Sequence, residues 1–347
     1  MLITLALDAM GGDIGPKVVI EGAYLALNTI KCKGSLQFIF FGDEGCINKE
    51  LIKFPELAEK SKIVHTDTII RNETKPTSAV RMGRKSNLGS AIDSVVQGQS
   101  QAVVSAGNTG AYMALSTILL KTLKGINRPA IPALMPTKNG KKVVLLDVGA
   151  NIECDEENLV QFALMGEAFS KEIFNLEKPT IGLLNIGSED LKGNVTVQKA
   201  TKFLKGLKDL NFFGFVEGND ITLGTTDIVV TDGFTGNVAL KTIEGTAHLI
   251  KSFLKEALAS SWLGKLGYLI ARKNFKELEM RIDPRFYNGA VFLGLKHIAV
   301  KSHGSTDALG FANAIKVAMQ MVQGNLIQKI EQRLSLISET FSHSSNV

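Results

Sequence analysis

One local pattern recurs six times along this 347-residue chain and constrains its fold more than any other feature. Each copy has a short Leu-rich or β-branched run, a turn of small polar residues, and then a segment with helical spacing. The apolar runs cover residues 2–7, 102–104, 143–146, 180–184, 228–230 and 298–300. Continuous apolar runs that alternate with helices are typical of strands buried on both faces. The pattern therefore predicts an α/β fold with a doubly wound, mostly parallel sheet.

The turns that follow these runs are rich in glycine and in short polar side chains. They cover residues 8–13, 105–110, 147–151, 185–189, 231–237 and 301–305. In a doubly wound sheet the carboxyl ends of the strands lie along one edge, where ligands bind. Glycine lets backbone N–H groups approach an anion, and the helix that follows adds a partial positive charge. We therefore expect the six turns to converge on one pocket that binds a phosphate-rich ligand.

Composition narrows the class of protein. Hydrophobic residues make up 45% of the chain and charged residues 21%, as in soluble globular proteins. The net charge of +5 fits an acidic partner or an anionic membrane surface, whereas an aromatic content of 7% argues against nucleic-acid binding. Cys32, Cys46 and Cys154 are too few and too scattered for a disulfide framework or a zinc site, so we expect a cytoplasmic location.

The chain shows no obvious division into separate domains. We expect one large α/β unit over residues 1–335, with two lobes that share a cleft left open as an alternative, and a tail over residues 336–347. The apolar start runs directly into Asp8 without a basic segment, which predicts a first strand rather than a signal peptide. Pro16 and Asp155 are placed to begin two of the helices.

Familiar nucleotide-binding and nucleophile motifs are not matched. The glycines of residues 107–110 do not have the Rossmann spacing, and no strand is followed by a complete P-loop. No Gly-x-Ser-x-Gly elbow follows a strand either, which argues against a serine nucleophile. ATP, NAD and acyl-enzyme chemistry are therefore disfavoured.

The motifs taken together resemble the PlsX family of phosphate acyltransferases. The resemblance extends over nearly the whole chain and depends on the sequences at residues 8–13 with Pro16, 105–111, 128–130, 145–151, 192–194, 232–237 and 301–305. It implies transfer of a fatty acyl group from an acyl-carrier-protein thioester to inorganic phosphate, giving acyl phosphate for glycerophospholipid synthesis without a cofactor. It also implies a fold similar to isocitrate and isopropylmalate dehydrogenases and to phosphotransacetylases.

The resemblance further implies a homodimer that contacts anionic membranes peripherally. Whether the downstream glycerol-phosphate acyltransferase binds directly stays open. Phosphate carries a deprotonated oxygen at neutral pH, so positioning matters more than a strong base. We expect catalytic roles for Asn108, Lys192, Asn237 and His303. We expect phosphate or substrate contacts from Asp8, Gly11, Gly12, Asp13, Arg81, Lys85, Ser105, Gly107, Thr109, Gly110, Asn151, Asn185, Asp232, Gly233, Thr235 and Gly236.

Several of these residues have an alternative interpretation. His303 precedes Gly304 and Ser305 at a helix start, where it could protonate the leaving thiolate, donate to phosphate, or serve only as a hydrogen-bonded structural residue. Arg81 and Lys85 could lie on a solvated helix face. The carboxylates at the strand ends could hold a hard metal ion, but capping of turn and helix N–H groups is the reading we favour, and we expect no metal.

The segment 239–270 carries apolar residues at helical spacing, among them Leu254 and Leu258, with Trp262 nearby and lysines elsewhere. Core packing, a homodimer face and docking on anionic lipid all fit this pattern. Three rival functions also stay open: a phosphotransacetylase-like enzyme that uses acyl-CoA, a non-catalytic scaffold for carrier protein or membrane, and a metal- and NAD-dependent dehydrogenase of related fold.

Overall fold

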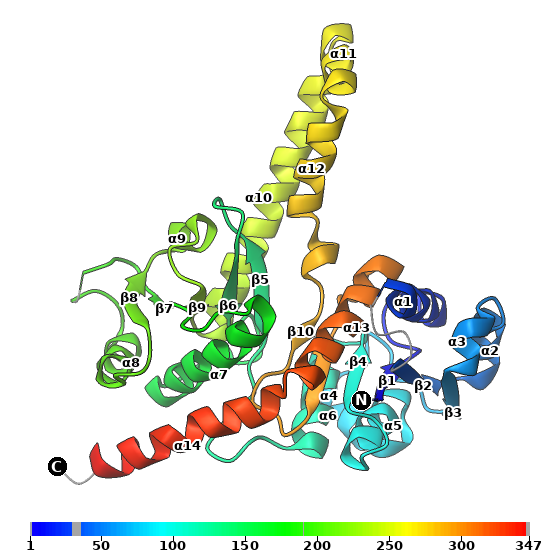
Figure 1. Ribbon diagram of the computed structural model, residues 1–347, viewed down its shortest axis with the longest axis horizontal. Coiled ribbons are helices and arrows are strands. Elements are labelled where there is room, and N and C mark those ends of the chain that lie inside the picture. Colours follow the sequence, from blue (N-terminus) through cyan, green and yellow to red (C-terminus); the bar gives the residue numbers. More distant parts are fainter. Residues whose placement is uncertain (1, 30–35, 190, 345–347) are drawn as a thin grey trace.

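The computed structural model describes residues 2–29, 36–189 and 191–344, with side chains up to residue 335, so Cys32 lies outside the described residues. Two β-sheets lie side by side, each covered by helices, and a long helical hairpin projects from them (Figure 1). The doubly wound, mostly parallel α/β fold predicted from the sequence is confirmed.

The first sheet has the strand order β10-β11-β4-β1-β2-β3. All neighbours pair in parallel except β10 and β11. Its strands are β1 (Ile3–Asp8), β2 (Leu36–Gly42), β3 (Ser61–His65), β4 (Ala102–Ser105), β10 (Ala290–Val291) and β11 (Ile298–Lys301). The helices of this part are α1 (Pro16–Thr29), α2 (Glu44–Leu51), α3 (Pro55–Glu59), α4 (Pro76–Met82), α5 (Asn87–Val96), α6 (Thr109–Leu120) and α13 (Ala308–Gln323), with 3-10 helices η2 (Gly83–Lys85) and η3 (Pro284–Tyr287).

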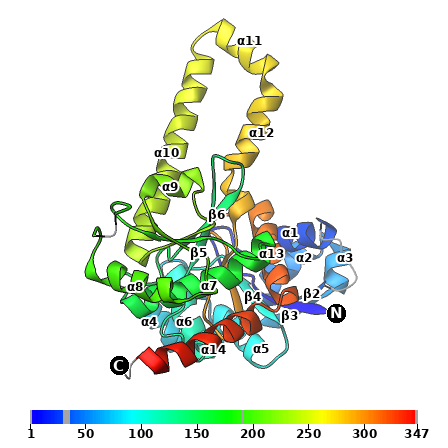
Figure 2. The same cartoon turned by 60° about the vertical axis from the view of Figure 1, so that its left-hand side comes forward.

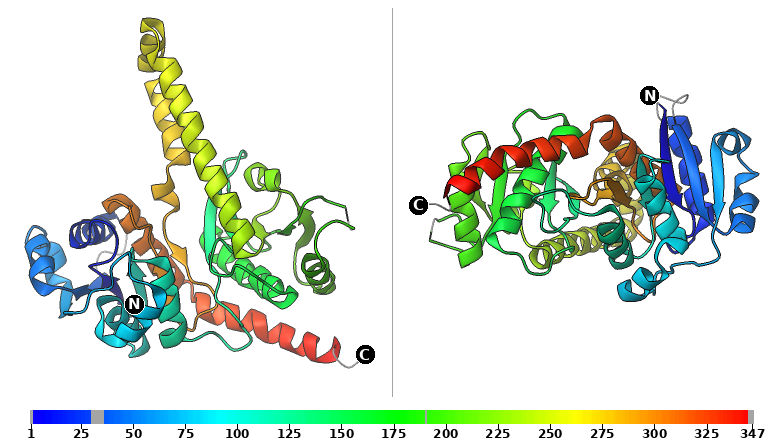
Figure 3. Two further views of the ribbon diagram at one scale, coloured as in Figure 1. Left: turned by 180° about the vertical axis from the view of Figure 1, so that it is seen from behind. Right: turned by 90° about the horizontal axis from the view of Figure 1, so that it is seen from below.

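The second sheet has the order β5-β6-β9-β7-β8 and is parallel except where β5 meets β6. Its strands are β5 (Pro132–Pro136), β6 (Lys142–Leu146), β7 (Ile181–Leu184), β8 (Phe212–Val216) and β9 (Ile228–Val230). It is covered by α7 (Glu156–Phe174), α8 (Val195–Gly206) and α9 (Gly218–Leu223). The last helix, α14 (Leu326–Ser344), lies along α7 (Figure 3).

Local sequence signals set several of these boundaries. Helix α1 begins at Pro16, where a missing N–H leaves no bond unmade. Helix α7 begins after Asp155, whose carboxylate accepts from the Asn158 amide while the Asn158 side chain bonds back in a capping box. Both predicted helix starts are confirmed. Buried side chains of both sheets, such as Leu5 and Val144, belong to one continuous hydrophobic core.

The expectation that all six glycine-rich turns share one sheet edge was wrong. Strands β1, β4 and β11 belong to the first sheet, whereas β6, β7 and β9 belong to the second. An apolar run identifies a buried strand, but its neighbours depend on contacts distant in the sequence. In the C-terminal segment, residues 336–344 continue α14.

A helical hairpin stands away from the two sheets (Figure 2). It is built from α10 (Gly233–Ala259), α11 (Trp262–Ile270) and α12 (Arg272–Ile282). Leu254 is 37% exposed and Trp262 is 73% exposed, while Leu258 is partly buried. Packing of these three side chains into the core of their own chain is therefore excluded. No helix among the described residues is long and apolar enough to cross a membrane.

Candidate functional site

The turns after β1 and β4 are joined by the carboxylate of Asp8, which is almost fully buried. The Ser105 hydroxyl donates to it at 2.6 Å, the Asn87 amide at 2.6 Å and the Met10 backbone N–H at 3.2 Å. Burial raises the pKa of Asp8 above its usual value, and these hydrogen bonds act in the opposite direction. Asp8 thus satisfies donors of both turns, which fits the capping reading of this carboxylate.

Glycines let three turns of the first sheet approach one another closely. A Cβ on Gly11 would lie 2.5 Å from Asp8 Oδ2 and 2.7 Å from the Gly107 nitrogen. Gly12 has φ +88°, and a Cβ there would lie 3.0 Å from the Gly304 carbonyl oxygen. The Asp13 N–H donates to that carbonyl at 2.9 Å. The turns after β1, β4 and β11 therefore form one cluster, as the sequence predicted for this subset.

The Asn72 loop covers one side of this cluster. The Asn72 amide donates to Asp13 at 2.6 Å, and the Asn108 amide donates to the Asn72 carbonyl at 2.6 Å. Asn108 is also the N-cap of α6, where its side-chain oxygen accepts from the Ala111 N–H at 2.8 Å. These contacts favour a supporting role for Asn108. Thr109 and Gly110 are the exposed first residues of α6, whose N-terminal N–H groups have no acceptor within the helix.

A buried lysine that was not among the expected site residues lies in the same cluster. Lys301 ends β11 and is 8% exposed. Its ammonium donates to the carbonyl oxygens of Ala106, at 3.3 Å, and of Ser302. Burial lowers the pKa of Lys301 to about 8, although Asp8 and Asp13 favour its charged form. The available signal was a lysine at the end of an otherwise apolar strand.

His303 lies next to Lys301 on the same turn. Its Nδ1 accepts from the Ser305 N–H at 3.3 Å and contacts the Ser305 hydroxyl at 3.0 Å. Because a backbone N–H can only donate, the proton of the neutral ring belongs on Nε2. Burial, followed by the charges of Lys301 and Lys241, lowers the pKa of His303. These effects favour the neutral ring, with Nε2 as the donor.

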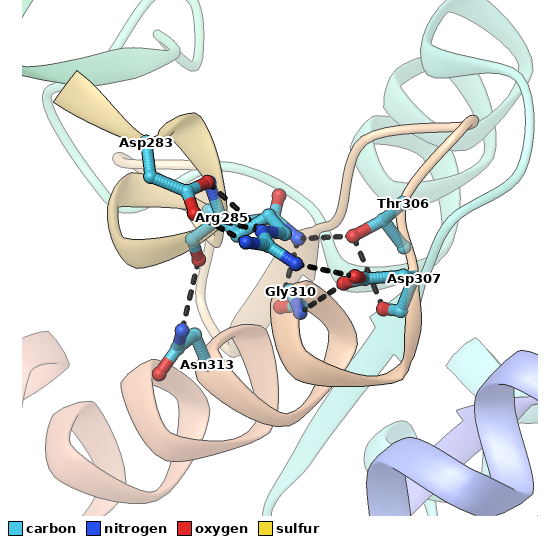
Figure 4. A network of polar contacts seen from close by, with 7 residues as sticks. Asp283, Arg285, Thr306, Asp307, Gly310 and Asn313 are labelled. Atoms are coloured by element: carbon cyan, nitrogen blue, oxygen red, sulfur yellow. Dashed lines mark hydrogen bonds and ion pairs between the residues drawn. The ribbon is translucent and has the colours of Figure 1, made fainter. Parts of the chain in front are cut away.

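A polar network joins Asp283 and Arg285, which follow α12, to Asp307 at the start of α13 (Figure 4). Arg285 forms ion pairs with Asp283 at 2.6 Å and with Asp307 at 2.9 Å. Asn288 accepts from the His303 N–H at 2.9 Å. The Asn288 amide nitrogen donates to Ser302 Oγ at 2.8 Å, Thr306 Oγ1 at 3.1 Å and the Gly310 carbonyl at 2.8 Å. Asn288 thus holds the His303 turn in place, a role that no motif indicated.

A second cluster forms at the ends of β6 and β9. The fully buried Asp147 accepts from the Ile131 N–H at 2.9 Å and from the Asn151 backbone and side chain at 2.7 and 2.9 Å. The Gly233 N–H donates to the Asn151 carbonyl at 2.7 Å. A Cβ on Gly233 would lie 2.8 Å from Asp147 Oδ2, so only glycine fits there. The strand ends β6 and β9 are therefore tied together through Asn151.

The start of α10 completes this second cluster. Asp232 is the N-cap and accepts from both the N–H and the hydroxyl of Thr235 at 2.8 Å. Gly236 follows within the first turn, and Asn237 lies near Gly149. The expected residues Asn151, Asp232, Gly233, Thr235, Gly236 and Asn237 are thus brought together at the ends of strands of the second sheet.

The remaining expected residues are Asn185 and three cations with exposed side chains. Asn185, at the end of β7, donates to the carbonyls of Gly187 and Lys192 at 3.1 and 3.2 Å, while the Lys192 side chain is exposed. Arg81 and Lys85 are exposed on α4 and η2, and α4 packs against α6.

Helix α10 begins in the second cluster and carries charges that act on the first. It starts at Asp232, and farther along it Lys241 and Glu244 both influence the pKa of His303. Two surface crevices of about 270 and 410 Å³ are lined by none of the expected site residues. Within the described part of the chain, no group of three or more His, Cys, Asp or Glu side chains is placed to hold a metal ion.

Comparison with solved structures supports the fold. The chain superimposes on a phosphotransacetylase from Streptococcus pyogenes with a TM-score of 0.61 and 19% identity, covering 93% of this chain and 94% of that one. A 4-hydroxythreonine-4-phosphate dehydrogenase from Klebsiella pneumoniae gives a TM-score of 0.53 and 14% identity, covering 93% and 98% of the two chains. At these identities the likeness concerns the fold alone.

Comparison with curated sequences identifies the family of this chain. Residues 3–329 match the family described as "Fatty acid synthesis protein". The "Phosphate acyltransferase" of Rhodospirillum centenum is 52% identical over 332 residues, which cover 95% of this chain and 92% of the relative. That of Paramagnetospirillum magneticum is 50% identical over 321 residues, covering 92% and 90%. This chain therefore belongs to the fatty acid synthesis protein family of phosphate acyltransferases, the PlsX family that its motifs predicted.

Proposed function

We propose that this chain transfers a fatty acyl group from the thioester of acyl carrier protein to inorganic phosphate and so makes acyl phosphate for glycerophospholipid synthesis. The observation that carries the proposal is the first cluster, where three glycine-rich turns meet beside the buried ammonium of Lys301. Small residues and a buried cation suit a compact anion such as phosphate. The curated relatives, named phosphate acyltransferases, support the same reaction class.

The chemistry needs little beyond positioning and charge stabilisation. Phosphate supplies its own anionic oxygen, and correct orientation of two reactants can contribute roughly 7–11 kcal/mol. Donors aimed at the tetrahedral oxyanion add about 3–4 kcal/mol per key contact. The Nε2–H of His303 and the N-terminal N–H groups of α6, which follows the β4 turn, are donors that could serve this purpose.

The test is to incubate purified protein with long-chain acyl carrier protein and phosphate, without added metal, and to quantify free carrier and acyl phosphate. We expect carrier release that requires phosphate. A matched reaction with acyl-CoA separates this function from a phosphotransacetylase-like preference. Release that is independent of phosphate, or acyl phosphate formed only from acyl-CoA, would contradict the proposed donor or acceptor.

Lys192 is proposed to contribute positive charge to phosphate binding. Its exposure and its place on the loop after β7 leave it able to reach a ligand without unfolding. Lys192→Ala should raise the KM for phosphate, with Lys178→Ala in the loop before β7 as a matched control. An unchanged KM for phosphate would remove Lys192 from the site.

The hairpin is proposed to dock on anionic membrane and to take part in a homodimer. Leu254 and Trp262 expose apolar surface on α10 and α11, the helices that project from the sheets (Figure 1), and Lys255 and Lys265 lie on the same helices. Leu258→Glu should weaken binding to anionic vesicles in flotation assays, while subunit association is followed by sedimentation. Ile52→Glu, which replaces an exposed apolar residue in the first lobe, is the control. Equal vesicle binding by both variants would rule out docking through this helix.

A further inference from the structure

Among the described residues, Lys301 is the one buried cation of the first cluster. A buried ammonium is costly unless it is paired, and replacing such groups by apolar side chains often stabilises proteins. Among the described residues Lys301 forms no ion pair within 4 Å, and its named partners are two neutral carbonyls, those of Ala106 and Ser302. An ammonium has three N–H groups, so one more acceptor can be accommodated.

Lys301 interacts with all three glycine-rich turns of the first cluster. Its own strand leads into the His303 turn, its ammonium reaches the Ala106 carbonyl after β4, and the charges of Asp8 and Asp13 act on it from the turn after β1. These two carboxylates and His303 are the titratable groups that face it. Lys301 therefore occupies the place where the three glycine-rich turns would surround an anion.

We propose that Lys301 is a catalytic residue that binds the attacking phosphate and relays the phosphate proton to the departing thiol. This inference rests on the proposed acyl transfer to phosphate. An oxygen of HPO₄²⁻ forms the new C–O bond to the thioester carbon, and the C–S bond breaks with its electron pair on sulfur. The Lys301 ammonium gives one proton to sulfur, and the remaining phosphate hydroxyl returns one proton to the amine. The products are the acyl phosphate dianion and a neutral thiol, with lysine restored.

Proton relay requires a group that both holds and releases a proton near neutral pH. Burial brings the pKa of Lys301 to about 8, close to the value of roughly 8.5 for a free thiol. Matching the pKa of an acid to the group that it protonates gives efficient transfer. A surface lysine stays protonated over this range, and an arginine guanidinium never releases its proton in proteins.

The test uses two donors with the same acyl chain and different leaving groups: the acyl carrier protein, whose pantetheine thiol is basic, and the thioester of a more acidic arylthiol. The variants are Lys301→Met, which removes the proton and the charge, and Lys301→Arg, which keeps the charge. Lys296→Met, at an exposed position just before β11, is the matched control. Turnover, the KM for phosphate and the pH dependence of kcat are measured for each.

We expect Lys301→Met to lower kcat with the carrier-protein donor by roughly 10²–10⁴-fold and to lose much less with the arylthiol donor, because an acidic thiolate leaves without a proton. Lys301→Arg should keep a KM for phosphate within a few-fold of the wild type but show the same donor dependence. The ratio of the two donor rates is unaffected by partial unfolding of a sample. If Lys301→Met does not fold, the ratio measured for Lys301→Arg decides.

Equal losses with both donors, or full turnover by both variants, would overturn the relay. Failure of the proposed function has a different signature: wild type and Lys296→Met alike would release no carrier in response to phosphate, which overturns both proposals. If the wild type is active and the donor ratio is unchanged in the Lys301 variants, only the role of Lys301 is overturned and the proposed function stands.

Discussion

Gly11→Ala tests whether the turns after β1 and β4 truly pack against one another. The added methyl group would lie 2.5 Å from Asp8 Oδ2, 2.7 Å from the Gly107 nitrogen and 3.0 Å from Ser105 Oγ. None of these atoms is the end of a long flexible side chain. Two belong to a buried hydrogen bond and the third to the backbone. The substitution must therefore displace the turns themselves.

The expected magnitude follows from two contributions. Ordinary contact distances are about 3.5–4.0 Å, so the turns must separate by roughly an ångström. Overpacking of this kind destabilises proteins by about 1–3 kcal/mol, and breaking the buried bond between Ser105 and Asp8 adds about 1–3 kcal/mol. We expect the free energy of unfolding to fall by about 2–6 kcal/mol. A displacement of about 1 Å near the chemistry should also lower kcat/KM by roughly 100-fold.

The assay combines urea unfolding followed by circular dichroism with phosphate-dependent release of carrier thiol. Gly245→Ala is the matched control, because Gly245 lies within α10 with no atom within 4 Å of an added Cβ. Alanine in an open helical position stabilises by about 0.5–1 kcal/mol, so this variant should not lose stability. If Gly11→Ala keeps the stability and activity of the wild type, the close approach of the two turns is not as described.

Three further outcomes are expected. Asn288→Ala removes the hydrogen-bond partner of the His303 N–H, Ser302 and Thr306, so we expect activity to fall at least 10-fold and stability to fall by about 1–3 kcal/mol. Denaturation and rate measurements on the same samples check this. A loss of activity no larger than the loss of folded protein would contradict it. The pKa of Lys301 is about 8 in the folded chain and higher in the unfolded chain, so the unfolded state binds more protons above pH 8 and stability should rise between about pH 8 and 10.5. Lys301 should contribute about 3 kcal/mol to this rise, and Lys301→Met should lack that contribution. Identical pH profiles of unfolding for the two proteins would contradict the burial of the charge. Asp155→Ala should lower stability by about 1 kcal/mol through loss of the α7 cap, as measured by thermal unfolding, and no change would show that the cap is dispensable.

The exposed hairpin shows where sequence patterns become ambiguous. Leu254 and Leu258 repeat at helical spacing, and that spacing correctly predicts a helix. The same spacing suits a core, a subunit interface or a lipid surface, since each offers an apolar environment to one helix face. For Leu254 and Leu258 the structure rules out the core of their own chain, because this part of the hairpin projects beyond both sheets.

The candidate site likewise combines residues that local sequence patterns identified with residues that only the fold revealed. Glycine-rich turns after apolar strands identified most of the residues around Asp8 and Asn151, since backbone conformation and strand burial are local properties that sequence encodes directly. Nothing local distinguished Asn288, and the lysine that ends an apolar strand did not by itself reveal the burial of Lys301, because both roles depend on partners on other elements, such as His303 and Ala106. Buried polar groups gain their chemistry from surroundings assembled by the whole fold.

The amino-acid sequence by itself determined the family, the alternation of strands and helices, the caps at Pro16 and Asp155, and the polar turns that end the strands. Only the tertiary structure decided that these turns divide between two sheets, three to each, and that a lysine is enclosed among the first three. The physical reason is range: a turn or a cap is set by residues a few positions apart, whereas strand neighbours and burial are set by contacts between segments far apart in the chain.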